Sequence, residues 1–230
     1  MFSCKSKDDA EDQDTKKDKD KRERYAATHG EEEGHEWINL GLSVRWATMN
    51  VGAAAPNERG KYYAWGETEP KSEYTWETYT LCNGTDNTLT KYCLNSSLGF
   101  NSYTDTDTIL LLADDAAHVA WGGKWRMPTR LEMVELMTKC SWEWTTQNGK
   151  EGVKVSGNGQ SIFLPATGRK DGTSWNNGTT LVNYWSSTLV ESSRHGYGLI
   201  ISNNEGTVNW MNGIAYQRYY GAPVRAVCSK

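Results

Sequence analysis

Short apolar runs separated by turn residues make up the second half of the chain. Two such runs, 199–201 and 208–211, are held apart by Asn203-Asn204-Glu205-Gly206. Because Asn and Gly tolerate the positive φ angles of tight turns, this pattern predicts a β-hairpin. Alternating or continuous apolar positions of the same kind precede it at Trp142, Trp144, Val153, Val155 and 162–164. We therefore expect the second half to be β-structure.

Helix-start signals, and apolar residues spaced as on one face of a helix, lie between residues 114 and 139. Asp114 and Asp115 place carboxylates at the start of an Ala-rich stretch, where the positive end of a helix dipole favours them. Thr129 and Glu132 have the spacing of a capping box. The next helix should cover about 130–139, with a one-sided apolar stripe of Leu131, Val134 and Met137 that Met133 and Leu136 widen. Trp121 and Trp125, between the helices, are expected in the core.

The chain divides into a charged leader and one globular domain. Residues 1–35 mix both signs of charge with almost no apolar side chains, so they predict a disordered linker. The domain is expected to span 36–230. Within it, 67–108 is rich in Thr, Asn, Asp and Ser, which predicts a long irregular excursion from the regular elements.

The composition favours a loop-rich, β-containing domain with a surface suited to binding. The chain has 11 Trp and 12 Tyr against 3 Phe, together with 22 Gly. Trp and Tyr carry a polar atom at the tip of the ring and suit positions between core and surface. The net charge of −4, with no basic stripe in the globular part, gives no reason to propose a nucleic-acid partner.

The first residues resemble the start of a mature bacterial lipoprotein. Met1-Phe2-Ser3 precedes Cys4, and a charged run follows it, as in surface-exported lipoproteins of the Bacteroides type. The resemblance implies lipidation at Cys4, with 5–35 as a tether and the cell surface, or alternatively the periplasm, as the location. The resemblance also implies that the protein contacts the membrane only through the lipid on Cys4. An ordinary cytosolic start with an incidental Cys is the alternative, because no apolar h-region is present.

Four further cysteines allow disulfides or free thiols. Cys82, Cys93, Cys140 and Cys228 permit three pairings, among which the sequence does not choose. Reduced, buried thiols are the alternative. The chain has no Cys-x-x-Cys, so neither a zinc ribbon nor a dithiol redox site is expected.

Few residues have the spacing of catalytic or metal-binding groups. Ser186-Ser187 lacks the Gly-x-Ser-x-Gly elbow of a nucleophilic serine. The histidines, of which His118 and His195 lie in the fold, have no partner at metal-ligand spacing. Carboxylates that could gather around calcium are better explained by helix caps and loop solvation: Asp105, Asp107, Asp114 and Asp115. We expect no metal and no cofactor.

Several Trp-containing motifs, in order along 36–230, resemble one family. They are the segment 37–48, Tyr63-Ala64-Trp65-Gly66-Glu67, Asp115-Ala116-Ala117, Trp125-Arg126-Met127-Pro128-Thr129, Phe163-Leu164-Pro165-Ala166, Tyr184-Trp185-Ser186-Ser187 and Gly221-Ala222-Pro223-Val224-Arg225. Together they resemble the Fibrobacter succinogenes-type major paralogous domain proteins of gut Bacteroidetes. The resemblance implies an α+β, C-type-lectin-like fold with two main helices against short antiparallel sheets. It also implies relatives among formylglycine-generating enzymes and the variable receptors of diversity-generating retroelements.

Two departures from those relatives favour a non-catalytic role. Formylglycine-generating enzymes use two nearby cysteines in the C-terminal half, whereas Cys228 stands alone there. Calcium-dependent sugar-binding lectins carry Trp-Asn-Asp, whereas this chain has Val208-Asn209-Trp210 followed by Met211. We therefore expect a monomeric receptor or adhesin that binds protein or glycan without catalysis. A structural or fimbrial envelope module is the alternative, and an enzyme of the formylglycine-generating kind is a weaker one.

The C-terminal segment supplies the expected binding residues. Tyr, Ser and Asn give rigid aromatic area and adaptable hydrogen bonds. The candidates are Ser192, Ser193, His195, Tyr197, Asn203, Asn204, Asn209, Asn212, Ile214, Tyr216, Arg218 and Tyr219. Both a retroelement-diversified receptor and an ordinary paralogue fit this set. Two readings stay open, because Arg218 also fits a structural anchor and Tyr219-Tyr220 also fits packing against Trp185.

Overall fold

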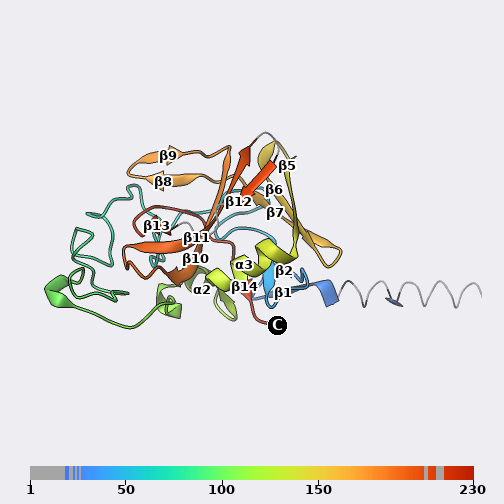
Figure 1. Cartoon of the computed structure of the whole chain (residues 1–230). Coiled ribbons are helices and arrows are strands. Elements are labelled where there is room, and N and C mark those ends of the chain that lie inside the picture. The colour runs from blue at the N-terminus through green and yellow to red at the C-terminus, as the bar shows by residue number, and fades with distance from the viewer. Residues whose placement is uncertain (1–18, 21–22, 24, 26, 205–206, 211–214) are drawn as a thin grey trace, which may run out of the picture.

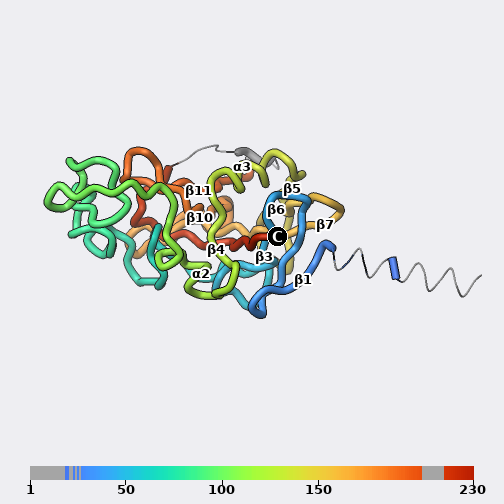
Figure 2. The backbone as a smooth tube through the Cα atoms, turned by 90° about the horizontal axis from the view of Figure 1, so that it is seen from below, coloured from blue at the N-terminus to red at the C-terminus, as the bar shows by residue number. Residues whose placement is uncertain are grey.

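The computed structural model describes residues 19–20, 23, 25, 27–204, 207–210 and 215–230 (Figure 1). It is strand-rich and mixed, with antiparallel sheets and short helices, and at this level it agrees with the predicted α+β class. The hairpins of β5 (Ser141–Gln147), β6 (Lys150–Gly157) and β7 (Gln160–Pro165) lie at one end, and the excursion of residues 67–108 lies at the other (Figures 1 and 2).

One sheet pairs strands from the start of the domain with the last strand of the chain. Its order is β1 (His29–Glu32), β2 (His35–Ile38), β3 (Arg45–Ala47), β14 (Val227–Cys228) and β4 (Trp125–Arg126). Glu33 and Gly34, with φ of 48° and 75°, make the tight turn between β1 and β2. The sheet therefore begins at His29, ahead of the boundary at residue 36 that the charge pattern indicated, because four residues of the charged leader pair with β2.

Two hairpins of the β5–β7 sheet follow from their turn residues. Asn148-Gly149, with φ of 48° and 73°, joins β5 to β6, and Asn158-Gly159, with φ of 52° and 70°, joins β6 to β7. Two consecutive positive φ angles match the right-handed twist of the paired strands. Along β6, Val153 and Val155 point into the core while Lys154 is exposed, which confirms the alternation read from the sequence.

The C-terminal sheet contains the hairpin predicted around Asn203 and Asn204. It comprises β10 (Leu181–Leu189), β11 (His195–Asn204), β12 (Thr207–Trp210) and β13 (Ala215–Gln217), with β11 paired to each of the others. Ile201 pairs with Trp210 and Asn204 with Thr207, so the predicted hairpin is confirmed. A separate ribbon of β8 (Arg169–Asp171) and β9 (Ser174–Asn176) lies beside it.

Both predicted helices are present, each with its expected cap. Helix α2 (Ala116–Trp121) begins after Asp115, whose side chain accepts from the amides of Ala117 and His118. Helix α3 (Arg130–Lys139) begins after Thr129, and the capping box with Glu132 is complete. The predicted apolar stripe of α3 is wrong in one respect: Leu131 is 73% exposed, and Met133 and Leu136 are the buried residues.

The excursion of residues 67–108 has little regular structure, as predicted, but it has its own packed interior. A 3-10 turn, η1 (Phe100–Ser102), lies within it, and a second, η2 (Leu112–Asp114), follows it. Its buried apolar side chains are Tyr74, Tyr79, Leu89, Tyr92, Cys93 and Leu98. The many polar residues therefore form its surface around a small aromatic core.

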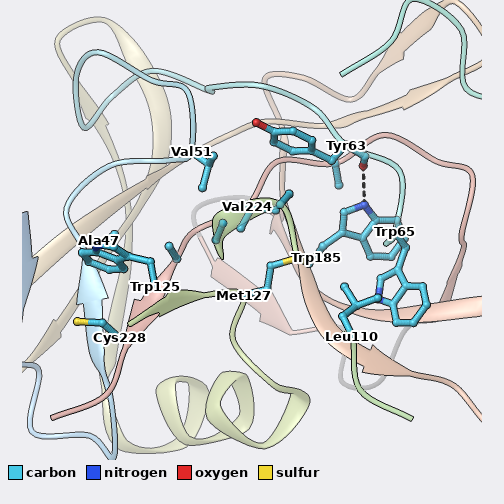
Figure 3. Close-up of a cluster of buried hydrophobic side chains, with 14 of the residues drawn as sticks. Ala47, Val51, Tyr63, Trp65, Leu110, Trp125, Met127, Trp185, Val224 and Cys228 are labelled. Carbon is cyan, nitrogen blue, oxygen red and sulfur yellow. Dashed lines mark hydrogen bonds between the residues drawn. The ribbon is translucent and has the colours of Figure 1, made fainter. Parts of the chain in front are cut away.

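Tryptophan side chains fill the main core (Figure 3), and their indole N–H groups donate hydrogen bonds to backbone carbonyls. The Trp185 indole N–H donates to Tyr63 O at 2.8 Å, Trp65 donates to Ser186 O at 2.9 Å, and Trp125 donates to Glu32 O at 2.7 Å. Trp125 is thus the core residue that was predicted, whereas Trp121 is half-buried and stacks on His35. Each bond links two segments that are distant in sequence, so the tryptophans hold parts of the chain together as well as filling space.

Buried Arg225 ties three segments together. Its guanidinium donates to Asn50 Oδ1 at 2.8 Å, to the carbonyls of Ala47 and Thr48 at 3.1 and 2.9 Å, and to Phe163 O at 2.9 Å. Burial lowers the pKa of Arg225, and the nearby Tyr184 partly offsets that shift. Arg225 therefore has a structural role.

The described cysteines are thiols, and the described helices are short. Cys82, Cys93, Cys140 and Cys228 are unpaired, which is the reduced alternative left open above. Cys4 lies outside the described residues.

No helix in the described part of the chain is long and apolar enough to cross a membrane.

Candidate functional site

The C-terminal residues predicted to bind lie on two sides of one strand pair. In the β11–β13 ladder His195 pairs with Gln217, Gly196 with Tyr216, and Tyr197 with Ala215. Neighbouring pairs in a ladder point to opposite faces. A Cβ at Gly196 would lie 2.5 Å from Trp65, so the Gly196–Tyr216 side faces the Trp core. His195 and Tyr197 therefore point away from Tyr216, so the predicted binding residues do not share one face.

The first side holds a small polar group near the start of α3. Ser192 Oγ lies 2.8 Å from His195 Nδ1, and the Tyr197 hydroxyl donates to Glu191 at 3.3 Å. The Arg130 guanidinium lies 4.7 Å from the centre of the Tyr197 ring. Burial, and then the charge of Arg194, lower the pKa of His195, so its imidazole is neutral at pH 7. This group offers polar contacts but little aromatic area.

The second side holds four half-buried aromatic rings and one half-buried arginine. We name this group the aromatic surface cluster: Trp76, Arg169, Tyr216, Tyr219 and Tyr220. Ring centres lie 5.3 Å apart for Trp76 and Tyr219, 4.7 Å for Tyr219 and Tyr220, and 5.9 Å for Tyr220 and Tyr216. All three contacts are edge-to-face. Tyr216 also meets the buried Trp185 at 6.2 Å, which anchors the cluster on the core.

Arg169 gives this cluster a positive charge. Its guanidinium lies 5.2 Å from the Tyr216 ring centre and 4.9 Å from that of Tyr220. The Arg169 Nε is buried and has no hydrogen-bond partner among the described residues. Burial raises the pKa of Tyr216 and of Tyr219, so both hydroxyls remain protonated donors near neutral pH. The cluster therefore presents ring faces, hydroxyl donors and one cation.

Arg218 and Ser193 do not belong to either surface, which corrects their prediction as ligand contacts. Both are 0% exposed. Arg218 donates to Tyr79 Oη at 2.8 Å and to the carbonyls of Tyr92, Ser193 and Lys91 at 3.1, 2.9 and 3.0 Å. Ser193 Oγ accepts from the Leu94 amide at 2.9 Å. Both side chains hold the excursion against the C-terminal sheet, because they satisfy backbone groups that regular structure would otherwise satisfy.

The other predicted residues are distributed along the β11–β12 hairpin. Asn203 is exposed near the end of β11. Asn204 and Asn209 occupy paired positions on β11 and β12, opposite Thr207 and Ser202. Asn212 and Ile214 lie outside the described residues.

Acidic residues that might have held calcium have structural partners. Asp105 accepts from the amides of Tyr92 and Cys93 at 2.6 and 3.0 Å, and Asp115 caps α2 and accepts from Met127 N at 2.8 Å. Asp114 accepts from Lys91 and from the Tyr92 hydroxyl. Within the described ranges no group of three or more His, Cys, Asp or Glu side chains is arranged to hold a metal.

Sequence reasoning missed Trp76 and Arg169, and it left Tyr220 open between binding and packing in the core, against which Tyr220 is partly buried. Trp76 is a lone Trp inside the polar excursion, and Arg169 follows the run that ends in Pro165-Ala166. Neither position has a local pattern, because the contacts that make the cluster join residues 76, 169 and 216–220. The single available signal was the surplus of Trp and Tyr over Phe.

Comparison of the chain with protein-family models, with curated proteins and with solved structures gives no match.

Proposed function

We propose that the chain is a non-catalytic ligand-binding domain of receptor or adhesin type that captures a protein or glycan at the aromatic surface cluster. The observation that carries the proposal is that Trp76, Tyr219, Tyr220 and Tyr216 form a chain of ring contacts at a half-exposed position, with Arg169 against Tyr216 and Tyr220. Clustered Tyr, Trp and Arg are the side chains that most often dominate binding energy. Their rings are already packed together, so little side-chain entropy is lost on binding.

The wider setting of the proposal is a bacterial surface lipoprotein with a C-type-lectin-like fold of the major paralogous domain type. Helices α2 and α3, the short antiparallel sheets and the long excursion support that fold. The charged leader and Cys4 support a lipid-anchored tether. The polar C-terminal hairpin is compatible with a diversified variable segment.

The direct test is an array of glycans and proteins probed with the full chain, followed by single substitutions. Tyr219→Ala should weaken capture of any hit at least tenfold, while Tyr103→Ala, at another partly exposed tyrosine, should leave it unchanged. Both variants should melt within a few degrees of the wild type. Equal loss of binding in the two variants, or loss of the fold with Tyr219→Ala, would refute the proposal.

A self-associating envelope module is the second candidate, because one segment exposes large apolar side chains. Ile109, Leu111, Leu112 and Val119 are each about half exposed, at 48%, 47%, 52% and 49%. Light scattering over a range of concentrations separates the two functions. A monomer at every concentration contradicts the module, whereas assembly that Leu112→Lys abolishes supports it.

A further inference from the structure

We infer that a second binding site, for a small zwitterion such as a short peptide with free termini, lies in a cleft on the opposite part of the domain. The cleft has a volume of about 470 Å³ and is lined by Glu36, Ile38, Thr48, Pro56, Thr145, Thr146, Gln147, Lys154, Ser161, Ile162 and Phe163. Ligand clefts are typically about 300–1,000 Å³ in volume. None of the C-terminal residues discussed above lines this cleft.

The floor of the cleft is apolar because of how β6 and β7 pair. Lys154 pairs with Phe163, so both side chains lie on the outer face of the hairpins, away from Val153 and Val155. Gly152, two residues before Lys154, shares that face, and a Cβ there would lie 2.6 Å from Phe163 Cζ. The missing side chain at Gly152 therefore lets the Phe163 ring lie flat across β6. Ile38, Pro56 and Ile162 complete the apolar part.

The walls carry both signs of charge. Glu36 pairs across strands with Glu31, so two carboxylates lie on the same face of β1 and β2. Lys154 enters the cleft from β6, where Glu143 is its cross-strand neighbour on β5. Among the described residues, neither Glu36 nor Lys154 has an ion-pair partner. An acidic wall and an ammonium group that do not neutralise each other match the two ends of a zwitterion.

Hydroxyl and amide groups also line the cleft. They come from Thr145, Gln147 and Ser161. Thr48 Oγ1 is buried there and has no hydrogen-bond partner in the described part of the protein. An unmade bond of this kind is unfavourable unless water or a ligand supplies the partner. The cleft thus combines an apolar floor, polar sides and opposite charges, which suits a di- or tripeptide with an apolar side chain.

The test uses the full chain, calorimetric titration and one probe in three forms. The probe is a Gly-Leu-Phe tripeptide with free termini, with its amino end acetylated, or with its carboxyl end amidated. The free form should bind, and each blocked form should bind at least tenfold more weakly. Glu36→Gln should remove the difference between free and acetylated peptide, and Lys154→Gln the difference between free and amidated peptide.

Two exposed neighbours serve as matched controls, since Glu33→Gln and Lys150→Gln change the same charges on the same hairpins but outside the cleft. They should leave all three affinities unchanged. No detectable binding of the free peptide, equal affinity for the three forms, or equal effects of the control and cleft variants would each overturn the inference. Because Tyr219 is remote from this cleft, Tyr219→Ala should not alter peptide binding, which separates this site from the proposed function.

Discussion

At the scale of single residues, two buried arginines decide how the C-terminal segment is attached. Arg218 and Arg225 both lie in the interior and donate mainly to backbone carbonyls of segments distant in sequence. The planar guanidinium has five donors in a fixed geometry, which a lysine cannot reproduce. Arg218 therefore holds the excursion against the C-terminal sheet. It was predicted to contact a ligand, but its role is structural.

Arg218→Lys is expected to lower the free energy of unfolding by about 3 kcal/mol, because several carbonyls lose their donor in a buried place. Urea denaturation of the wild type and the variant measures the difference. Lys150→Met, at an exposed position, should change stability by less than about 0.5 kcal/mol. A loss for Arg218→Lys no larger than for this control would contradict the assigned role.

The four described cysteines predict a second result at this scale. Burial raises the pKa of Cys82, Cys140 and Cys228, which slows their reaction as thiolates. A Cys4→Ser variant, purified without reductant, should show slow thiol labelling when folded and four reactive thiols in denaturant. Two or fewer thiols in denaturant would reveal a disulfide and contradict the structure.

At the scale of elements, α3 separates what local sequence determines from what packing determines. The start of α3 could be predicted from Thr129 and Glu132, because a capping box involves only residues within one turn. The buried face could not be read from spacing alone, because it depends on where the sheet lies. Leu131 fits the apolar stripe as well as Leu136 does, but α3 directs Leu136 into a buried cluster that also contains Val153 and Tyr184. Asn148-Gly149 was predictable for the same local reason as the cap.

The orientation of α3 predicts unequal costs for two similar substitutions. Leu136→Ala should lower the free energy of unfolding by about 2–5 kcal/mol, because Leu136 is fully buried and a cavity remains. Leu131→Ala should cost less than about 0.5 kcal/mol, since that side chain is mainly in water. Denaturant midpoints of the two variants provide the comparison. Equal costs would mean that the helix is rotated about its axis.

A carboxylate on α3 also makes stability depend on pH. Glu135 accepts from the amide and hydroxyl of Ser43 and from Lys139. Although burial acts to raise it, these bonds lower the pKa of Glu135 to about 2. A lowered folded-state pKa stabilises the protein above the unfolded value near 4.5, and this contribution disappears as the pH falls toward 2.

Glu135→Gln should therefore be less stable than the wild type at pH 7, and the difference should shrink steadily below pH 4.5. Chemical denaturation at several pH values measures both proteins. A stability difference that stays constant down to pH 2.5 would show that the Ser43 contact does not depend on the carboxylate charge.

At the scale of the whole molecule, the domain places the aromatic surface cluster and the charged cleft on separate parts of its surface. The excursion supplies Trp76, the ribbon of β8 and β9 supplies Arg169, and the C-terminal segment supplies the tyrosines. Sequence reasoning found the segment and its hairpin because both have local patterns. It did not find the cluster, because no spacing along the chain brings residues 76, 169 and 219 together. It listed His195 and Tyr216 together as binding residues, but the register of β11 and β13 directs them to opposite faces.

The most direct test of the binding proposal is a double-mutant cycle across the cluster. It measures the dissociation constant of a captured ligand for the wild type, Trp76→Ala, Tyr219→Ala and the double variant, with melting temperatures beside them. Because the two rings touch from different segments, each single change should weaken binding at least tenfold, and the double change should cost less than the sum of the two. Unchanged affinity in both single variants, with the fold intact, would contradict the proposal that this cluster is the binding surface.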